Sequence, residues 1–257
     1  MFSLQPLYTA DQVRSIDARA IARLQDEGFG LMQRAAAFSL KTLQSCWPQA
    51  RSLSVLAGPG NNGGDALVLA AMARQQGYRV RLHLLGAQPE ALQGAAAQAW
   101  ALAESAGLRL ATDPPQPACV QVDGLFGTGL ARPLRGESAL WVEALRGYRA
   151  QGQGVLALDI PSGWHADSGQ ALGPAVVADH CCSFVARKLG LDLGGLMDAA
   201  GQVHFDDLGV RAEDATGLEA PAHRLLSVHW AARRRGQHKG DCGHVLCVGG
   251  APEYAGA

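Results

Sequence analysis

The sequence predicts an α/β fold: a three-layer αβα sandwich around a mainly parallel sheet, followed by the start of a second domain. Three observations predict it. Short apolar runs alternate with Ala-rich helical stretches from Leu53 onward. Several of these runs end in a Gly-rich or acidic loop. Hydrophobic residues make up 48% of the 257 residues and charged residues 18%, which is typical of a packed enzyme domain.

Two helices are predicted before the first strand of this sheet. Thr9 is suited to cap a helix along which apolar and small residues recur at helical spacing, namely Val13, Ile16, Ala20 and Leu24. A Gly-containing segment then breaks the pattern. A second helix is expected from Leu31 to about Cys46, where Pro48 ends it.

The central part of the chain has a β-α-β-α rhythm. Strands are predicted within SLSVLAG, YRVRLHLLG, ACVQVDGLFG, GVLALDIPSG, HCCSFVA and GQVHFDD. The intervening helices are predicted within DALVLAAMARQQG, within PEALQGAAAQAWALAESAG and from about Glu137 to Ala150. This alternation favours a Rossmann-like parallel sheet with helices on both faces and right-handed connections.

A domain boundary is predicted near Leu218, dividing the chain into residues 1–218 and 219–257. The stretch EDATGLEAPAHRL is polar and aperiodic, as a linker would be. Beyond it we expect one apolar strand, His244 to Val248, and then a Gly-rich turn. Because one strand cannot form a domain, we expect the sequence to contain only the opening of a second domain.

Composition and charge exclude several classes of function. The formal net charge is −1 and the basic residues are scattered, so we expect no nucleic-acid partner. No apolar run reaches spanning length and the start does not read as a secretory signal, so we expect no membrane association.

The cysteines and histidines show no metal-binding motif in the sequence. Six cysteines lack CxxC or zinc-like spacing and are interpreted as reduced thiols of a cytoplasmic protein: Cys46, Cys119, Cys181, Cys182, Cys242 and Cys247. The eight histidines are dispersed, and His83 and His204, within predicted strands, are interpreted as structural residues.

The clearest local signal is GPGNNGGDALVLA, residues 58–70, where a strand runs through a Gly-rich turn into a helix. Backbone N–H groups and the helix N-terminus of such a turn favour a phosphate or dinucleotide. The segment is neither a GxGxxG motif nor a P-loop. An Asn-Gly pair also marks plain turns, so that alternative stays open.

Two further strand ends carry polar residues, VDGLFGTGLARP at 122–133 and ALDIPSG at 157–163. Because the carboxyl ends of parallel strands share one edge, one cleft is expected to collect Asn61, Asn62, Asp65, Asp123, Thr128, Asp159 and Ser162. The oxygen atoms of Asn62, Asp123 and Ser162 suit a hard cation. An Asp at a strand end can also simply cap the next helix.

These segments resemble the NAD(P)H-hydrate epimerase family. The motif-like stretches are GNNGGD at 60–65, DGLFGTGL at 123–130, LDIPSG at 158–163, and ADHCCSF followed by KLGL; LMQRAA at 31–36 is similar to the family's LMERAG. The tail HKGDCGHVLCVGG, 238–250, resembles the opening strand of the ADP-dependent NAD(P)H-hydrate dehydratase domain, which is ribokinase-like.

The resemblance implies epimerisation of the R form of NADH or NADPH hydrated at C6 (NADHX or NADPHX) to the S form. It implies Asp159 as the catalytic acid/base. One potassium ion per subunit would lie on Asn62, Asp123 and Ser162. The implied substrate-binding residues are Asn61, Asn62, Gly63, Gly64, Asp65, Gly127, Thr128, Gly129, Leu130, Ala131, Arg132, Pro133 and Asp159. The full-length protein is expected to be bifunctional, with ADP or ATP serving only the second domain.

Two alternative functions and the oligomeric state have to be considered at this stage. A non-catalytic nucleotide-binding or scaffolding module would keep the cleft without the reaction. An ordinary Rossmann oxidoreductase is disfavoured, because the first loop lacks GxGxxG and QGYRVRLHLLG lacks the acidic ribose-binding residue. The N-terminal helices could pair in a homodimer or higher homo-oligomer, although packing within one chain explains the same apolar stripe.

Overall fold

The computed structural model describes residues 2–25, 28–86 and 88–228. Its contacts divide the chain into two units. The larger unit, Gln5–Arg224, contains the main sheet and the helices that cover it. The smaller unit consists of the two chain ends. The strands β1 (Phe2–Leu7) and β8 (Ala222–Val228) pair in a separate two-stranded sheet.

The elements of the larger unit follow the alternating order that the sequence predicts. The helices are α1 (Ala10–Leu24), α2 (Phe29–Cys46), α3 (Asn61–Gln75), α4 (Gly94–Ser105), α5 (Glu137–Ala150) and α6 (Leu196–Ala199). The strands are β2 (Ser52–Ala57), β3 (Arg79–Leu84), β4 (Val120–Gly124), β5 (Gly154–Leu158), β6 (His180–Phe184) and β7 (Gln202–Asp206). Short 3-10 helices occupy Pro89–Ala91, Leu189–Asp192 and Ala212–Ala215.

The main sheet has six strands in the order β3-β2-β4-β5-β6-β7, and every neighbouring pair is parallel. The chain leaves β2 toward β3 on one side and later returns to place β4 on the other side. This reversal between β2 and β4 is a topological switch point, where open α/β sheets bind ligands at the carboxyl ends of their strands.

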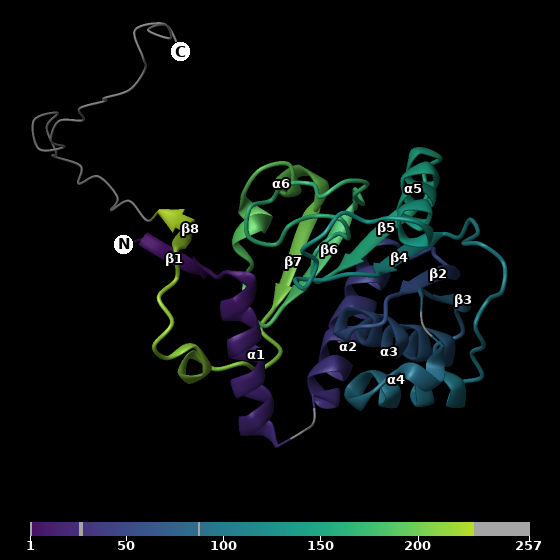
Figure 1. Cartoon of the computed structure of the whole chain (residues 1–257), viewed down its shortest axis with the longest axis horizontal. Helices are drawn as coiled ribbons and strands as arrows, with labels where there is room; N and C mark the ends of the chain where they lie inside the picture. Colours follow the sequence, from purple (N-terminus) through teal and green to yellow (C-terminus); the bar gives the residue numbers. More distant parts are fainter. Residues whose placement is uncertain (1, 26–27, 87, 229–257) are drawn as a thin grey trace, which may run out of the picture. The chain divides into compact units, whose positions relative to one another are not determined.

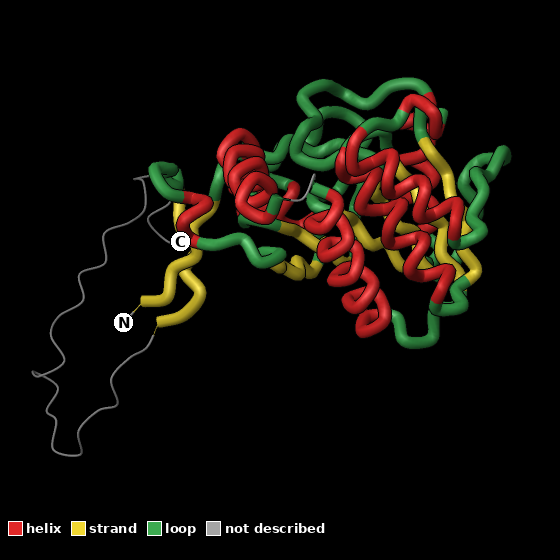
Figure 2. Tube along the Cα trace, turned by 90° about the horizontal axis from the view of Figure 1, so that it is seen from below, coloured by secondary structure: helices red, strands yellow, loops and turns green. Residues whose placement is uncertain are grey.

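Helices cover both faces of the sheet, which confirms the predicted three-layer α/β architecture (Figures 1 and 2). Leu53 and Val55 of β2 share a core cluster with residues of α2, α3 and α4. Leu56, on the opposite side of the same strand, belongs to a second cluster with Trp141 and Leu145 of α5. Alternate side chains of one strand therefore enter two cores, which explains why the strands read as continuous apolar runs.

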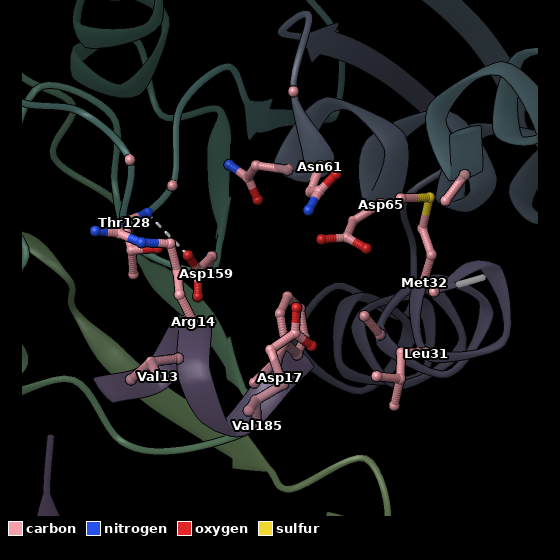
Figure 3. Close-up of a pocket in the computed structure, with 18 of the residues that line it drawn as sticks. Val13, Arg14, Asp17, Leu31, Met32, Asn61, Asp65, Thr128, Asp159 and Val185 are labelled. Atoms are coloured by element: carbon pink, nitrogen blue, oxygen red, sulfur yellow. Dashed lines mark hydrogen bonds between the residues drawn. The ribbon is translucent and has the colours of Figure 1, made fainter. Parts of the chain in front are cut away.

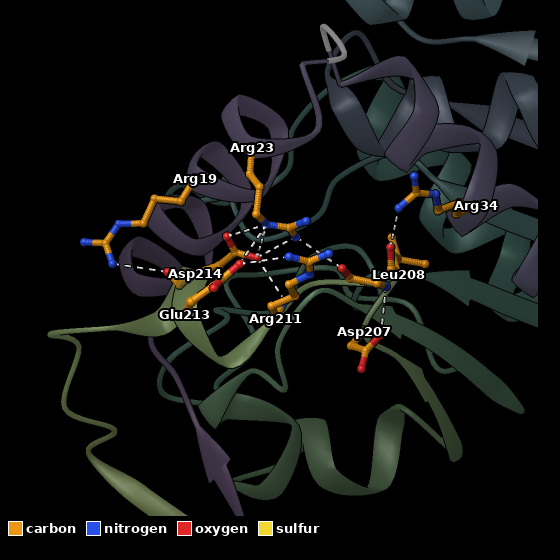
Figure 4. Close-up of polar contacts among 9 residues, drawn as sticks. Arg19, Arg23, Arg34, Asp207, Leu208, Arg211, Glu213 and Asp214 are labelled. Carbon is orange, nitrogen blue, oxygen red and sulfur yellow. Dashed lines mark hydrogen bonds and ion pairs between the residues drawn. The ribbon is translucent and has the colours of Figure 1, made fainter.

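The first helix is capped as predicted and is tied to the end of the larger unit. The Thr9 hydroxyl accepts the Gln12 backbone N–H, and the Gln12 side chain accepts the Thr9 N–H, a capping box. Near the other end, the guanidinium of Arg23 donates to both carboxylate oxygens of Asp214 (Figure 4). These contacts hold α1 beside the 3-10 helix Ala212–Ala215.

The structure differs from the sequence prediction in three places. Helix α3 begins at Asn61, so the segment 61–65 is its first turn and not a loop before it. The stretch 213–225, predicted as a linker, contains part of a 3-10 helix and the start of β8. The strand β1 was not predicted. The predicted strand His244 to Val248 lies outside the described residues. Within the described part of the chain, no helix is long and apolar enough to cross a membrane.

Candidate functional site

A cavity of about 770 Å³ lies at the carboxyl ends of the strands on both sides of the switch point. Its size is within the range of about 300–1,000 Å³ that is common for small-molecule sites. The first residue of α3, Asn61, and the loops after β4 and β5, with Thr128 and Asp159, line it (Figure 3). Helices α1 and α2 complete the wall with residues that include Asp17 and Met32.

The loop after β2 holds the chain close to neighbouring backbone. A Cβ on Gly58 would lie 1.8 Å from the carbonyl oxygen of Leu125, and a Cβ on Gly63 would lie 1.8 Å from that of Gly58. Only glycine allows these approaches. The result is that α3 starts at the edge of the cavity, with the free N–H groups of its first turn available to an anionic ligand.

Asp159 is held in a constrained position in the cavity. Its backbone has a φ of 64°, a left-handed conformation that is rare for residues other than glycine, asparagine and aspartate. The Thr128 N–H donates to Oδ2 at 3.1 Å, and the Lys188 ammonium pairs with Oδ1. A Cβ on Gly127 would lie only 2.5 Å from Oδ2, so this glycine makes room for the carboxylate.

Lys188 is the buried cation of the site. Its side chain is 1% exposed, and the ammonium also donates to the carbonyl oxygen of Phe184 at 2.7 Å and to the Ser183 hydroxyl at 3.3 Å. All three of these partners are oxygen atoms. A buried ammonium with such a set of acceptors is held in place, and it fixes the position of the Asp159 carboxylate in the cavity.

Asp65 faces the same cavity, but its carboxyl group has a different electrostatic environment from that of Asp159 (Figure 3). Burial raises its pKa well above the usual value, and the negative charges of Asp159 and Asp17 raise it further, while Lys188 opposes them. A carboxyl group whose pKa is raised therefore shares the cavity with a carboxylate that is paired with a cation. Two carboxyl groups whose environments differ in this way can serve as an acid and a base.

Asp123 and Ser162 are buried and in direct contact with each other, whereas Asn62 lines the cavity. The Ser162 hydroxyl donates to Asp123 Oδ1 at 2.6 Å, and the Ser162 N–H donates to Oδ2 at 2.8 Å. The side-chain oxygen and nitrogen of Asn62 are buried and have no hydrogen-bond partner. Burial raises the pKa of Asp123 to about 6, against the hydrogen bonds from Ser162.

Comparison with known proteins assigns a family to this arrangement. The family model described as YjeF-related protein N-terminus matches residues 28–190, which contain the loops after β2, β4 and β5 and also Lys188. The chain belongs to this family.

Relatives of this YjeF N-terminal chain have names that concern one metabolite. It is 37% identical over 262 residues to the bifunctional NAD(P)H-hydrate repair enzyme Nnr of Coxiella burnetii, covering 98% of this chain and 52% of that protein. It is also 37% identical over 232 residues to the NAD(P)H-hydrate epimerase of Bordetella bronchiseptica, covering 88% and 97%. The chain thus spans about half the length of the bifunctional relatives.

A solved structure supports the fold. The crystal structure of a yeast protein aligns with a TM-score of 0.64 at 21% identity, over 77% of this chain and 86% of the yeast chain. At that identity the likeness concerns the fold alone.

The YjeF N-terminal fold brings most of the sequence-predicted residues together. The residues that line the cavity are Asn61, Asn62, Asp65, Gly127, Thr128, Gly129, Leu130 and Asp159. Asp123 and Ser162 are buried beneath it. Gly63 and Gly64 do not line it, because they face the Gly58 backbone and the Met32 side chain and serve packing. Ala131, Arg132 and Pro133 are exposed and lie outside the lining.

Sequence reasoning did not assign Lys188, Arg14 or Asp17 to the site. Lys188 opens the KLGL motif, and the signal that could have found it is the Arg-Lys pair that follows the apolar residues at the end of a buried strand. Arg14 and Asp17 line the cavity from α1. In the sequence, the charged residues of this helix are typical of a face exposed to solvent. Only the position of α1 over the edge of the sheet shows that Arg14 and Asp17 belong to the cavity.

Proposed function

We propose that the chain epimerises the R form of hydrated NADH or NADPH to the S form. The observation that carries the proposal is the pair of unlike carboxyl groups, Asp159 with Lys188 and Asp65 opposite, in a cavity at the switch point of the sheet. The names of the relatives support the substrate, since two of them act on NAD(P)H hydrate.

The reaction requires the configuration at one carbon, C6 of the reduced ring, to be inverted. Asp159 would accept the proton of the C6 hydroxyl while Asp65 donates a proton to the ring nitrogen, so that the C6–N bond breaks and an aldehyde forms. Rotation presents the opposite face of the aldehyde. Reclosure by the reverse transfers returns both protons to their starting groups and leaves the S hydrate.

Lys188 and the backbone of the loops would position the reactants. The Lys188 ammonium pairs with one carboxylate oxygen of Asp159, and the Thr128 N–H donates to the other, so the two contacts fix the orientation of the carboxylate. The free N–H groups at the start of α3 are suited to the pyrophosphate. Recognition through backbone amides is consistent with acceptance of both NADHX and NADPHX.

Asn62, Asp123 and Ser162 fit a potassium ion. Asn62 offers an amide oxygen that has no other partner, Asp123 a buried carboxylate and Ser162 a hydroxyl, which are the oxygen donors that hard cations prefer. When bound, the ion would supply a fixed positive charge near the phosphate-binding loop. Asn62, Asp123 and Ser162 would hold it and connect the loops after β2, β4 and β5.

We further propose that the full-length protein is bifunctional. The segment from residue 219 onward would be the start of a dehydratase domain that uses ADP or ATP. Its relatives from Coxiella burnetii and Escherichia coli are named bifunctional NAD(P)H-hydrate repair enzymes. The cysteine spacing in the sequence supports a cytoplasmic location. A homodimer remains a prediction.

A direct assay tests the epimerase proposal. Purified protein is given the R epimer of hydrated NADPH, and the S epimer is followed by chiral chromatography with and without potassium. We expect conversion well above the spontaneous rate. Binding of the hydrate without acceleration would favour the non-catalytic module instead.

Asp159→Asn tests the assigned base, because asparagine also tolerates the left-handed backbone. We expect this variant to fold and to lose most of the activity. Asp198→Asn, the same change at an exposed carboxylate on α6, is the matched control and should retain it. Wild-type turnover by the Asp159 variant would refute its role.

A further inference from the structure

A second cluster of chemically reactive side chains lies at the opposite edge of the sheet from the cavity. Cys46 is the last residue of α2, His180 is the first residue of β6, and His204 lies within β7. From the sequence, Cys46 is expected to be a reduced thiol, because the cysteines lack metal-binding spacing, and His204 a structural residue, because it lies in a predicted strand. The fold brings the three together from distant segments.

The contacts within the cluster are close. His180 Nδ1 lies 3.1 Å from His204 Nε2, and Cys46 Sγ lies 3.9 Å from the same nitrogen. All three ligand atoms lie within 4.8 Å of one another. The His180 ring is held by an edge-to-face contact with Trp47, with ring centroids 4.9 Å apart.

These spacings match those around a tetrahedral zinc ion. With Zn–N bonds of about 2.05 Å and Zn–S bonds of about 2.3 Å, two nitrogens are about 3.3 Å apart and a nitrogen and a sulfur about 3.6 Å apart. The His180–His204 and Cys46–His204 separations differ from these values by a few tenths of an ångström.

The register of the strands explains why the cluster forms. His180 and Cys182 are two residues apart on β6 and share a face of the sheet, and Cys182 pairs with His204 on β7. Helix α2 packs on that face, because Cys182 and Phe184 share a core cluster with Leu40 and Leu43. The C-terminus of α2 therefore delivers Cys46 to both histidines.

The chemistry of the donors favours zinc over potassium or magnesium. Imidazole and thiolate are borderline or soft ligands, whereas Asn62, Asp123 and Ser162 offer oxygen atoms. Zinc binds the neutral form of imidazole and the deprotonated form of a thiol, so its binding releases the thiol proton.

We propose that Cys46, His180 and His204 form a zinc-binding site with its fourth position open to water. The three residues are half-buried, so solvent reaches the cluster. The site connects α2, β6 and β7 and is independent of the proposed epimerase function. It is expected to stabilise the folded state, because zinc would bind this arrangement and not the unfolded chain.

The test uses the full chain without an affinity tag, stripped with a chelator and then titrated with zinc alone. The tail also contains His238, Cys242, His244 and Cys247, so stoichiometry by itself does not locate the ion. Alkylation followed by peptide mass spectrometry measures which thiols zinc protects. We expect zinc to protect Cys46. Alkylation of Cys46 at the metal-free rate under saturating zinc would overturn the proposal.

Substitutions provide the second measurement. Loss of a residue that only hydrogen-bonds to a metal ligand weakens metal affinity about 10- to 100-fold. Cys46→Ala and His204→Gln each remove a ligand itself, so each should weaken zinc binding by at least that factor. Cys119→Ala, an exposed thiol elsewhere in the chain, is the matched control and should leave the affinity unchanged. Cobalt should give a thiolate charge-transfer band in the parent protein that Cys46→Ala removes. Unchanged zinc affinity in both cluster variants would also refute the site.

Discussion

Replacement of Lys188 by methionine should destabilise the folded protein by about 3 kcal/mol. The ammonium is buried at 1% exposure, and its removal leaves the Asp159 carboxylate, 16% exposed, without its cation. Breaking a buried ion pair by removing one partner costs about 3–5 kcal/mol, and the access of Asp159 to the cavity places the loss near the lower end. For a protein of this size, about 3 kcal/mol lowers the melting temperature by about 6–12 °C.

A double-mutant cycle separates this effect from lost packing. Asp159→Asn alone leaves Lys188 as the unpaired charge, whereas Lys188→Met combined with Asp159→Asn removes both charges. We therefore expect the double variant to be more stable than the sum of the single losses predicts, with a coupling of about 2 kcal/mol measured by urea unfolding.

The matched control is an exposed ion pair. Arg146 and Glu143 on α5 have side chains that are 50% and 54% exposed, so Arg146→Met should cost less than about 1 kcal/mol. If Lys188→Met costs no more than this control, or if the cycle shows no coupling, the buried pair does not contribute as described.

Three further predictions concern the rest of the molecule. Gly63→Ala should lower the free energy of unfolding by about 1–3 kcal/mol, because its Cβ would lie 1.8 Å from a backbone carbonyl oxygen. Gly147→Ala, on α5 where a Cβ meets no neighbouring atom, is the control and should raise the free energy of unfolding by about 0.4–1 kcal/mol. Urea unfolding measures both changes. The hydrogen bonds from Arg23 lower the pKa of Asp214 to about 2, below its ordinary value. The contribution of this ion pair to the free energy of unfolding is therefore complete above about pH 4 and is lost as the pH falls toward 2. Asp214→Asn should flatten the stability profile in that window, and an unchanged profile would contradict the assignment. Potassium at about 100 times its dissociation constant should add about 2.7 kcal/mol, and Asn62→Ala should abolish most of the resulting thermal shift.

Periodicity in the sequence predicted the elements of the main sheet because the central strands β2, β4 and β5 are buried apolar runs and are followed by loops that contain glycine or aspartate. The capping residue Thr9 and the stop before Pro48 gave two helix boundaries closely. The start of α3 was placed late, because Asn-Asn-Gly-Gly has low helix propensity. Close packing of Gly63 against Gly58 overrides that propensity.

The candidate site was predicted where it depends on strand ends and was missed where it depends on tertiary position. Asp159 and Thr128 follow strands, so the parallel sheet alone places them at one edge. Asp17 belongs to a helix before the sheet, and nothing local indicates that α1 covers the cavity. Cys46, His180 and His204 meet only through strand register and helix packing, which spacing in the sequence does not encode.

The strand order also determines how the chain must fold. Leu53 of β2 pairs with Val120 of β4, although β3 and two helices separate them along the chain. In the described sheet each strand is joined to its neighbour by a crossover and never by a hairpin, so pairing waits for the closure of long loops. Apolar strands stay exposed during that interval, and aggregation competes with refolding at high protein concentration. The reversal between β2 and β4 that opens the ligand crevice is thus also a point at which folding is slow.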